Sequence, residues 1–234
     1  MKPYTYLLID LGAVLVPFIF SFHPRLRFSK NFLPFFLANA IVAAFFIVWD
    51  YYFTHLGIWG FNDDYLIGVK LGLLPLEEIL FFIFIPFSCT FSFHCFRVLK
   101  INFFSKKIAR LVSVFLAPSL LIMGSIFYSK AYTAFAFLGC GLFIMLAFVV
   151  QRKPWAGLLL STYTVMLLPF FIVNGLLTGT GLEKPVVWYN DKENLAIRLL
   201  TIPVEDIFYG FLLVGGTIYI YEFLLAKKRK LYAV

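Results

Sequence analysis

Charged side chains are scarce in this sequence, and their scarcity excludes a water-soluble domain. Of the 234 residues, 14% are charged and 62% are hydrophobic. A typical soluble domain is about half apolar and carries about 25% charged residues. We therefore expect an integral membrane protein in which the few charged positions mark loops or functional groups.

Cysteine and histidine are also rare, which argues against a disulfide framework and against a metal centre. The three cysteines, Cys89, Cys95 and Cys140, lie in apolar runs without paired spacing, so we expect small packing residues. His55 and His94 have no partner at the spacing of metal ligands. The stretch "GTGLEK" follows an apolar run rather than a strand, so it is no dinucleotide fingerprint. We expect no metal and no cofactor.

Seven apolar runs are long enough to cross a membrane, which takes about 20 residues. They are residues 4–22, 32–52, 73–96, 110–128, 131–150, 155–176 and 202–224. The first run contains Asp10 and has no small-residue cleavage site, so we expect a retained span rather than a signal peptide. Residues 111 to 150 are interrupted only by "YSK". One helix of that length would measure about 60 Å, twice the hydrocarbon thickness, so the chain must turn near Lys130.

Basic residues favour one side of this arrangement. Most of the 20 lysine and arginine residues lie in alternate loops and the C-terminal tail, at positions 25–30, 97–110, 152–153 and 227–230. The opposite side holds only Lys2, Lys70, Lys130, Lys184, Lys192 and Arg198. By the positive-inside rule we expect the N-terminus outside and the C-terminus in the cytoplasm. The formal net charge of +8 then reflects membrane topology rather than binding to nucleic acid.

The second half of the sequence repeats the first. Residues 59–81, "WGFNDDYLIGVKLGLLPLEEILF", align with residues 188–209, "WYNDKENLAIRLLTIPVEDIFY", at an offset of 128 from the Asn-Asp pair onward, and "YT" at 4–5 recurs at 132–133. We expect a first three-helix repeat in residues 1–105, a linking transmembrane helix in 106–129 and a second three-helix repeat in 130–234, all in one transmembrane domain. Such parallel repeats are related by an axis along the membrane normal, which puts both copies of the motif on the outer side.

Each copy of the motif carries two adjacent acidic residues at the start of an apolar run. These are Glu77 and Glu78 in "PLEE" and Glu205 and Asp206 in "PVED". Proline at the first helical position and acids in the first turn are typical of ordinary helix starts. A charge inside the bilayer costs about 2.5–3.5 kcal/mol on insertion scales, which favours a functional role. Adjacent helical residues point about 100° apart, so we expect one acid of each pair to line a cavity and the other to support it.

Other polar residues near the motifs have two interpretations each. Lys70 and Arg198 stand about two turns before the acidic pairs if the helices are continuous. There they would orient a carboxylate or anchor in the headgroups. Asp50 and Asn174 end the second and sixth spans, where they would hydrogen-bond an acidic residue or cap a helix.

These residues resemble those of a known family, the flavin-independent, membrane-integral lycopene β-cyclases of carotenoid biosynthesis. The resemblance rests on the doubled "PLEE" and "PVED" motif, the aromatic-Asn loop before each copy, and "WDYYFT" at residues 49–54. It covers nearly the whole chain, which looks like a fused form of two homologous bacterial subunits. It implies an all-α integral enzyme of the bacterial cytoplasmic membrane that converts lycopene to β-carotene through γ-carotene without a cofactor. The partners it implies are lycopene and carotenoid intermediates, membrane lipid and other enzymes of the pathway.

The resemblance carries the catalytic role over to Glu77, Glu78, Glu205 and Asp206. Cyclisation needs an acid to protonate an alkene, a base to remove a proton and a dry pocket. Burial and a like-charged neighbour favour the neutral acid that this chemistry requires. Aromatic faces stabilise the intermediate cation by about 0.5–2 kcal/mol each, although many aromatic residues of membrane proteins only pack or lie at the interfaces. The candidates for substrate contact are Trp49, Asp50, Tyr52, Trp59, Phe81, Phe82, Asn174, Trp188 and Tyr209.

One difference between the copies has a bearing on the substrate. Gly210 stands where the first copy has Phe82. A small residue in a span usually allows close helix packing, and here it would alternatively leave an open slot for a polyene.

Other functions use some of the same features. A carotenoid hydratase, or a cyclase of another carotenoid, would use similar acid chemistry. A proton-coupled transporter would use buried carboxylates as relays, although the phenylalanine-rich interior offers little path for a polar solute. A retinal-type photoreceptor needs a lysine midway along the last span, and residues 203–225 contain none.

Overall fold

The computed structural model describes residues 2–231, and seven long helices dominate this part of the chain. They are α1 (Thr5–Phe20), α2 (Phe32–His55), α3 (Leu76–Val98), α4 (Lys106–Ile126), α5 (Ala131–Ile144, extended by a π-helical segment, Met145–Val150), α6 (Ala156–Leu177) and α7 (Glu205–Leu231). Each helical segment is long and apolar enough to cross a membrane. The chain is thus an all-α membrane protein, as its composition predicts. Residue 1 and residues 232–234, which the predicted repeat boundaries include, lie outside the described residues.

All seven predicted spans match helices, and the fourth and fifth separate where the length argument requires. α4 ends at Ile126 and α5 begins at Ala131, so the chain turns back just before and at Lys130. These two helices pack closely because each contributes a glycine to their contact. A Cβ on Gly124 would lie 2.8 Å from the Leu138 side chain, and one on Gly141 would lie 3.1 Å from the Ala117 carbonyl oxygen.

The third and seventh helices begin later than predicted because short hairpins precede them. Strands β2 (Lys70–Leu71) and β3 (Leu74–Pro75) form one hairpin, and β5 (Arg198–Leu199) and β6 (Ile202–Pro203) form the other. Lys70 and Arg198 therefore do not stand on the helices of the acidic pairs. They form ion pairs at 2.7 Å with Asp63 and at 2.5 Å with Asp191, so the expectation that they orient a motif carboxylate is wrong.

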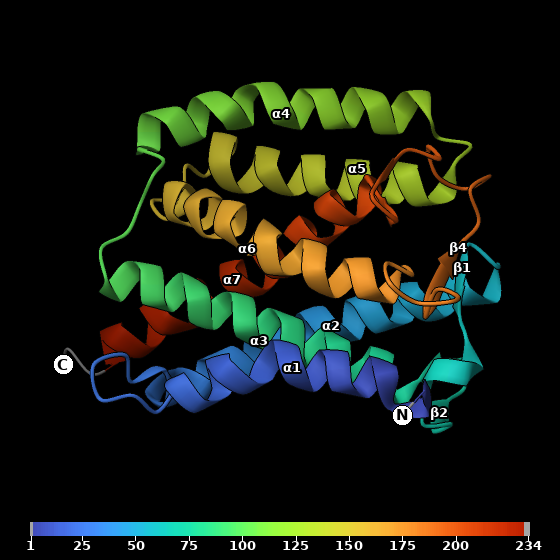
Figure 1. The fold of residues 1–234 in the computed structure, drawn as a ribbon. Coiled ribbons are helices and arrows are strands. Elements are labelled where there is room, and N and C mark those ends of the chain that lie inside the picture. Colours follow the sequence, from blue (N-terminus) through green and yellow to red (C-terminus); the bar gives the residue numbers. More distant parts are fainter. Residues whose placement is uncertain (1, 232–234) are drawn as a thin grey trace.

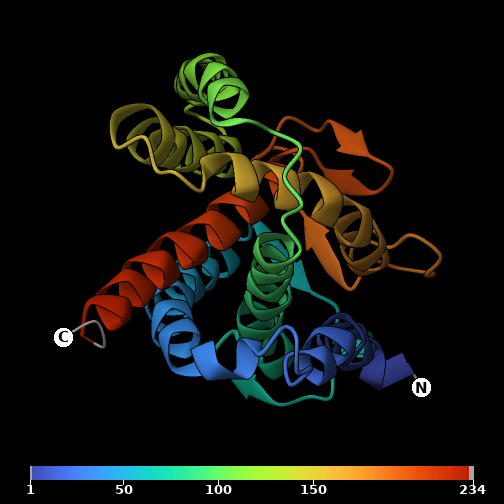
Figure 2. The same cartoon turned by 90° about the vertical axis from the view of Figure 1, so that its left-hand side faces the viewer.

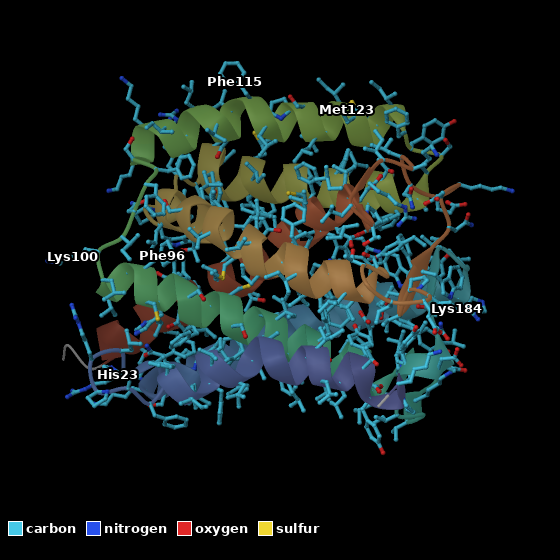
Figure 3. The ribbon with its side chains drawn as sticks, in the orientation of Figure 1. His23, Phe96, Lys100, Phe115, Met123 and Lys184 are labelled. Carbon is cyan, nitrogen blue, oxygen red and sulfur yellow. The ribbon has the colours of Figure 1, made fainter. Side chains whose placement is uncertain are left out.

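The loops divide between the two ends of the bundle. The N-terminus and the strands lie at one end, and the C-terminal end of α7 lies at the other (Figure 1). Figure 3 shows Lys184 at the strand-bearing end and His23 and Lys100 at the opposite end. The loops of residues 21–31, 99–105 and 151–155 therefore share an end with the C-terminal end of α7, and together with the helix ends that they join and the end of α7 they hold 14 of the 20 lysine and arginine residues.

Helix α4 lies at the edge of the bundle, on the far side of α5 from the first three helices (Figure 2). Its outer face is apolar: Phe115 is 67% exposed and Met123 is 37% exposed, as expected for side chains that meet lipid (Figure 3). The connection from α3 to α4 is held by Ser161 of α6, whose hydroxyl oxygen accepts the backbone N–H groups of Phe103 and Phe104 at 2.9 and 3.1 Å.

A two-stranded ribbon joins the two halves of the chain at the strand-bearing end. Strand β1 (Trp59–Phe61) pairs antiparallel with β4 (Val187–Tyr189), with Gly60 opposite Trp188. A Cβ on Gly60 would lie 2.4 Å from the indole ring of Trp188, so a side chain there would force this ring to move. Helices α3 and α7, which carry the acidic pairs, begin at this same end of the bundle (Figure 1).

We expect Gly60→Val to open this ribbon. The added side chain overlaps the indole ring, and overpacking of this kind costs about 1–3 kcal/mol. The midpoint of thermal unfolding of the detergent-solubilised protein should therefore fall. Gly12→Val is the matched control, because a Cβ on Gly12 meets nothing within 4 Å. Equal midpoints for the two variants would contradict this account of the ribbon.

Candidate active site

The two acidic pairs occupy the first turns of α3 and α7, and all four side chains are buried. Within each pair the two acids point in different directions, as the 100° helical rotation predicts. The second members, Glu78 and Asp206, line one shared cavity. The first members, Glu77 and Glu205, lie outside its lining.

Glu77 and Glu205 bind the loops that precede their helices. Glu77 Oε1 accepts the Ile67 backbone N–H at 2.7 Å, and Glu205 Oε1 accepts the Leu195 backbone N–H at 2.8 Å. Thr133 of α5 also donates its hydroxyl to Glu205 Oε1 at 2.6 Å. Both acceptor bonds reach ten residues back along the chain, so each acid fastens its hairpin to the start of its helix.

Glu78 and Asp206 differ in the number of donors they receive. The Tyr6 hydroxyl donates to Glu78 Oε2 at 2.5 Å. Asp206 receives three donors: the Tyr132 hydroxyl at 2.5 Å on Oδ1, and the Asn174 amide and Tyr189 hydroxyl at 3.1 Å each on Oδ2. An ionised carboxylate only accepts hydrogen bonds, so three donors favour the charged form of Asp206 more than one favours that of Glu78.

Tyr189 of the β1–β4 ribbon is a permanent donor in this network. Removal from water, together with the nearby carboxylates of Asp206 and Glu78, raises the pKa of the Tyr189 phenol well above its ordinary value. The hydroxyl therefore stays protonated throughout the neutral pH range.

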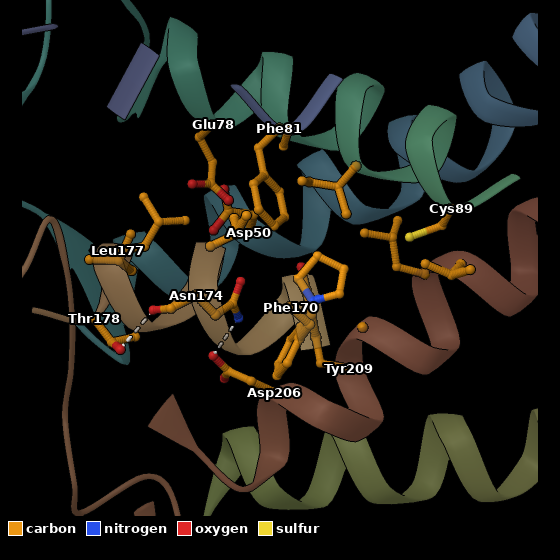
Figure 4. Close-up of a pocket in the computed structure, with 18 of the residues that line it drawn as sticks. Asp50, Glu78, Phe81, Cys89, Phe170, Asn174, Leu177, Thr178, Asp206 and Tyr209 are labelled. Atoms are coloured by element: carbon orange, nitrogen blue, oxygen red, sulfur yellow. Dashed lines mark hydrogen bonds between the residues drawn. The ribbon is translucent and has the colours of Figure 1, made fainter. Parts of the chain in front are cut away.

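A third carboxylate, Asp50 of α2, also faces the cavity and lies beside Glu78, close enough for their charges to interact (Figure 4). The Trp59 indole N–H donates to Asp50 Oδ1. Among the described residues, no lysine or arginine lines the cavity. Three like charges without a counter-ion repel one another strongly at low dielectric, so at least one of these acids must be neutral.

The cavity is polar at one end and apolar at the other. Glu78, Asp50 and Asp206 lie together at one end, and Cys89 of α3 lies toward the other (Figure 4). The lining comes from both halves of the chain, because α1 and α3 face α6 and α7 across it, and β1 and β4 contribute residues at the polar end.

Five of the nine residues predicted to bind substrate line this cavity: Asp50, Trp59, Phe81, Asn174 and Tyr209. The structure places the other four outside it. Trp49 and Phe82 are buried against Phe46, with ring centroids 5.4 and 6.1 Å from it. Tyr52 is 57% exposed and Trp188 is 42% exposed. Asn174 donates to Asp206, whereas Asp50 accepts from Trp59 and bonds no motif acid.

The tyrosines that hold the two cavity acids were not among the predicted residues. The repeated "YT" aligns Tyr4 with Tyr132, but Tyr4 is 56% exposed and the partner of Glu78 is Tyr6, two residues later. The repeat therefore points to the start of α1 but to the wrong tyrosine there. Asp10, one turn after Tyr6, is fully buried, and neither of its carboxylate oxygens finds a hydrogen-bond partner within residues 2–231.

The described residues contain no group of three or more His, Cys, Asp or Glu side chains that could hold a metal ion. The cavity acids are held instead by phenol, indole and amide donors. Such an arrangement can hold a proton on one carboxyl and accept one at another.

Comparison with known proteins gives one match. A family model described as lycopene cyclase matches residues 3–96 and 129–224. The unmatched segment between them contains α4 and the turns on either side of it. No curated protein and no solved structure matches the chain significantly.

We expect Glu77→Ala to destabilise the fold, because it removes the acceptor of the Ile67 N–H. A buried donor that is left without its acceptor costs about 1–3 kcal/mol. Glu77→Gln keeps an acceptor oxygen at the same place and should unfold close to the wild-type temperature. Thermal unfolding in detergent measures the difference. If alanine and glutamine behave alike, Glu77 does not fasten the hairpin.

Proposed function

Because the chain belongs to the lycopene cyclase family, we propose that it converts lycopene to β-carotene through γ-carotene, without a cofactor and without net redox change. The observation that carries the proposal is the pairing of Glu78 from the first half with Asp206 from the second half in one largely apolar cavity. A proton-initiated cyclisation needs at least an acid and a base that face the same enclosed space.

The reaction conserves its atoms. A carboxylic acid adds a proton to the terminal double bond and leaves a tertiary carbocation. The next double bond in reach attacks this cation and closes a six-membered ring, which moves the positive charge into the ring. A carboxylate then removes a ring proton and forms the ring double bond. One proton is added and one is lost at each end, so the product is an isomer of the substrate.

We assign the acid to Glu78 and the base to Asp206. Glu78 receives one donor, from Tyr6, so its charged form is supported less than that of Asp206 and its neutral, proton-donating form is favoured. Asp206 receives three donors, which favours the carboxylate that accepts a proton. Glu77 and Glu205 act as positioning residues, because they hold the loops and helix starts that carry the two cavity acids.

Aromatic faces around the acids would stabilise the cation. The Trp59 ring lies 5.1 Å from the Tyr132 ring and 6.1 Å from the Tyr209 ring, and all three residues line the cavity. A cation over such a face gains about 0.5–2 kcal/mol without meeting a nucleophile. Water would trap the cation as an alcohol, so the largely apolar lining of the cavity matters as much as the aromatic faces.

We propose that the enzyme lies in the bacterial cytoplasmic membrane with its N-terminus outside. The loops rich in lysine and arginine share an end with the C-terminus, which the positive-inside rule assigns to the cytoplasm. The acidic site then lies toward the outer face. We also propose repeats at residues 1–105 and 130–234 with a linking helix at 106–129. The two segments matched by the family model fall within these repeats, apart from residue 129.

Expression in a bacterial host that accumulates lycopene should yield β-carotene, with γ-carotene as the minor intermediate, identified by chromatography. An unchanged lycopene pool despite confirmed membrane expression would contradict the proposal. A hydroxylated acyclic carotenoid would identify the chain as a hydratase instead.

Glu78→Gln and Asp206→Asn should each lower the cyclisation rate by about 10²–10⁴-fold, the usual contribution of a general acid or base. Glu77→Gln and Glu205→Gln are the matched controls and should keep most of the activity, because a glutamine oxygen still accepts the loop N–H. Initial rates with lycopene in detergent or liposomes give the comparison. The assignment fails if the cavity variants are as active as the controls.

A further inference from the structure

The cavity extends well beyond the acids as an apolar arm between α3, α6 and α7, which we call the slot. Its lining includes Ile85 and Cys89 of α3, Met166 and Phe170 of α6, and Leu213 of α7. Along α3 the slot runs eleven residues from Glu78 to Cys89, which at 1.5 Å per residue is about 16 Å.

The few polar groups in the slot are already bonded within the protein. Tyr163 donates its hydroxyl to the Ile207 carbonyl at 2.6 Å. Ser88 lies within hydrogen-bond distance of two carbonyl oxygens, those of Ala13 at 3.0 Å and Phe84 at 2.9 Å. The slot therefore presents hydrocarbon surface, which suits an apolar chain and penalises a polar solute.

Gly210 lines the slot where α7 passes close to α6. A Cβ at this position would lie 3.0 Å from the Tyr163 hydroxyl oxygen and 3.7 Å from the Phe170 ring. The residue at the equivalent position of the first half, Phe82, is buried against Phe46 and does not line the cavity. In the described residues the slot extends from one side of the acids, and its lining comes from both halves.

Resting on the proposed cyclase function, we propose that the slot binds the polyene chain behind the reacting end and that Gly210 is a specificity-determining residue for it. The slot is about 16 Å long, whereas an extended carotenoid is long enough to cross the hydrocarbon core of about 30 Å. One end of the carotenoid and roughly half of its polyene occupy the protein, and the remainder lies in lipid.

The length and direction of the slot limit how the enzyme handles the two ends of a carotenoid. The far end group of the carotenoid stays outside the cavity, so the enzyme accepts any carotenoid with one acyclic end, whatever the other end carries. Because the slot is one-sided, the second ring requires the monocyclic product to leave and rebind in the opposite direction.

Gly210→Leu tests the slot directly. Leucine would fill space that the polyene needs, so we expect the Kd for lycopene and the KM to rise about tenfold or more. Binding is measured from the absorbance of polyene retained by the purified protein, which does not depend on turnover. Gly12→Leu is the matched control, since a Cβ on Gly12 meets nothing within 4 Å. Unchanged binding and KM in Gly210→Leu would overturn the proposal.

A second variant guards against misfolding of the first. Phe170→Ala removes the ring beside Gly210, and in the Gly210→Leu background it should restore lycopene binding to within about threefold of the wild type if crowding of the slot is the cause. Failure of this rescue, in a double variant that unfolds at the same temperature as the single variant, would count against the slot.

Unlabelled γ-carotene added during conversion of labelled lycopene tests the release step. We expect the added monocyclic carotenoid to dilute the label in β-carotene, whereas fully labelled β-carotene would overturn the one-sided slot. A wild-type protein that binds lycopene but forms no ring would refute the proposed cyclase function and leave the slot as a polyene site. Cyclisation of lycopene that is unaffected by Gly210→Leu would refute the slot and leave the proposed cyclase function standing.

Discussion

A carboxylate inside a lipid-embedded bundle has to find its hydrogen-bond donors within the protein, and the arrangement of this molecule follows from that requirement. Tyr6 of α1 supplies the donor for Glu78, and Tyr132 of α5 supplies one for Asp206. Each bond joins the first helix of one half to the third helix of the same half. The ribbon then brings in Tyr189 as a further donor. The same hydrogen bonds therefore hold the acids in place and join the helices.

The unequal supply of donors separates two acids that the sequence presents as equivalents. Both arise from the same repeated motif, and both enter the cavity from the second position of their pair. The difference lies in their partners, because Asn174 and Tyr189 reach Asp206 while the Asp50 carboxyl lies beside Glu78. Two carboxyl groups at equivalent positions of the repeated motif thus have different surroundings.

The spans and the acidic pairs could be predicted because they depend on local patterns. Apolar runs of sufficient length specify membrane helices, and the helical rotation separates Glu77 from Glu78. The hairpins before α3 and α7 could not be predicted, because Lys70 and Arg198 fit an amphipathic helix as well as a turn. The tyrosine donors could not be predicted, for a different reason. Tyr6 and Glu78 are 72 residues apart, and which of several nearby tyrosines reaches the carboxylate depends on packing.

Helix α4 contributes no side chain to the cavity and lies at the edge of the bundle, outside both segments that the family model matches. Its effect is on the end of the bundle at which the second half begins. Three helices leave the chain at the end opposite to where it started, and one more crossing returns it, so that α1 and α5 begin at the same end (Figure 1). A single polypeptide with two such halves needs an odd number of connecting helices to keep its acids together, whereas two separate chains would need none.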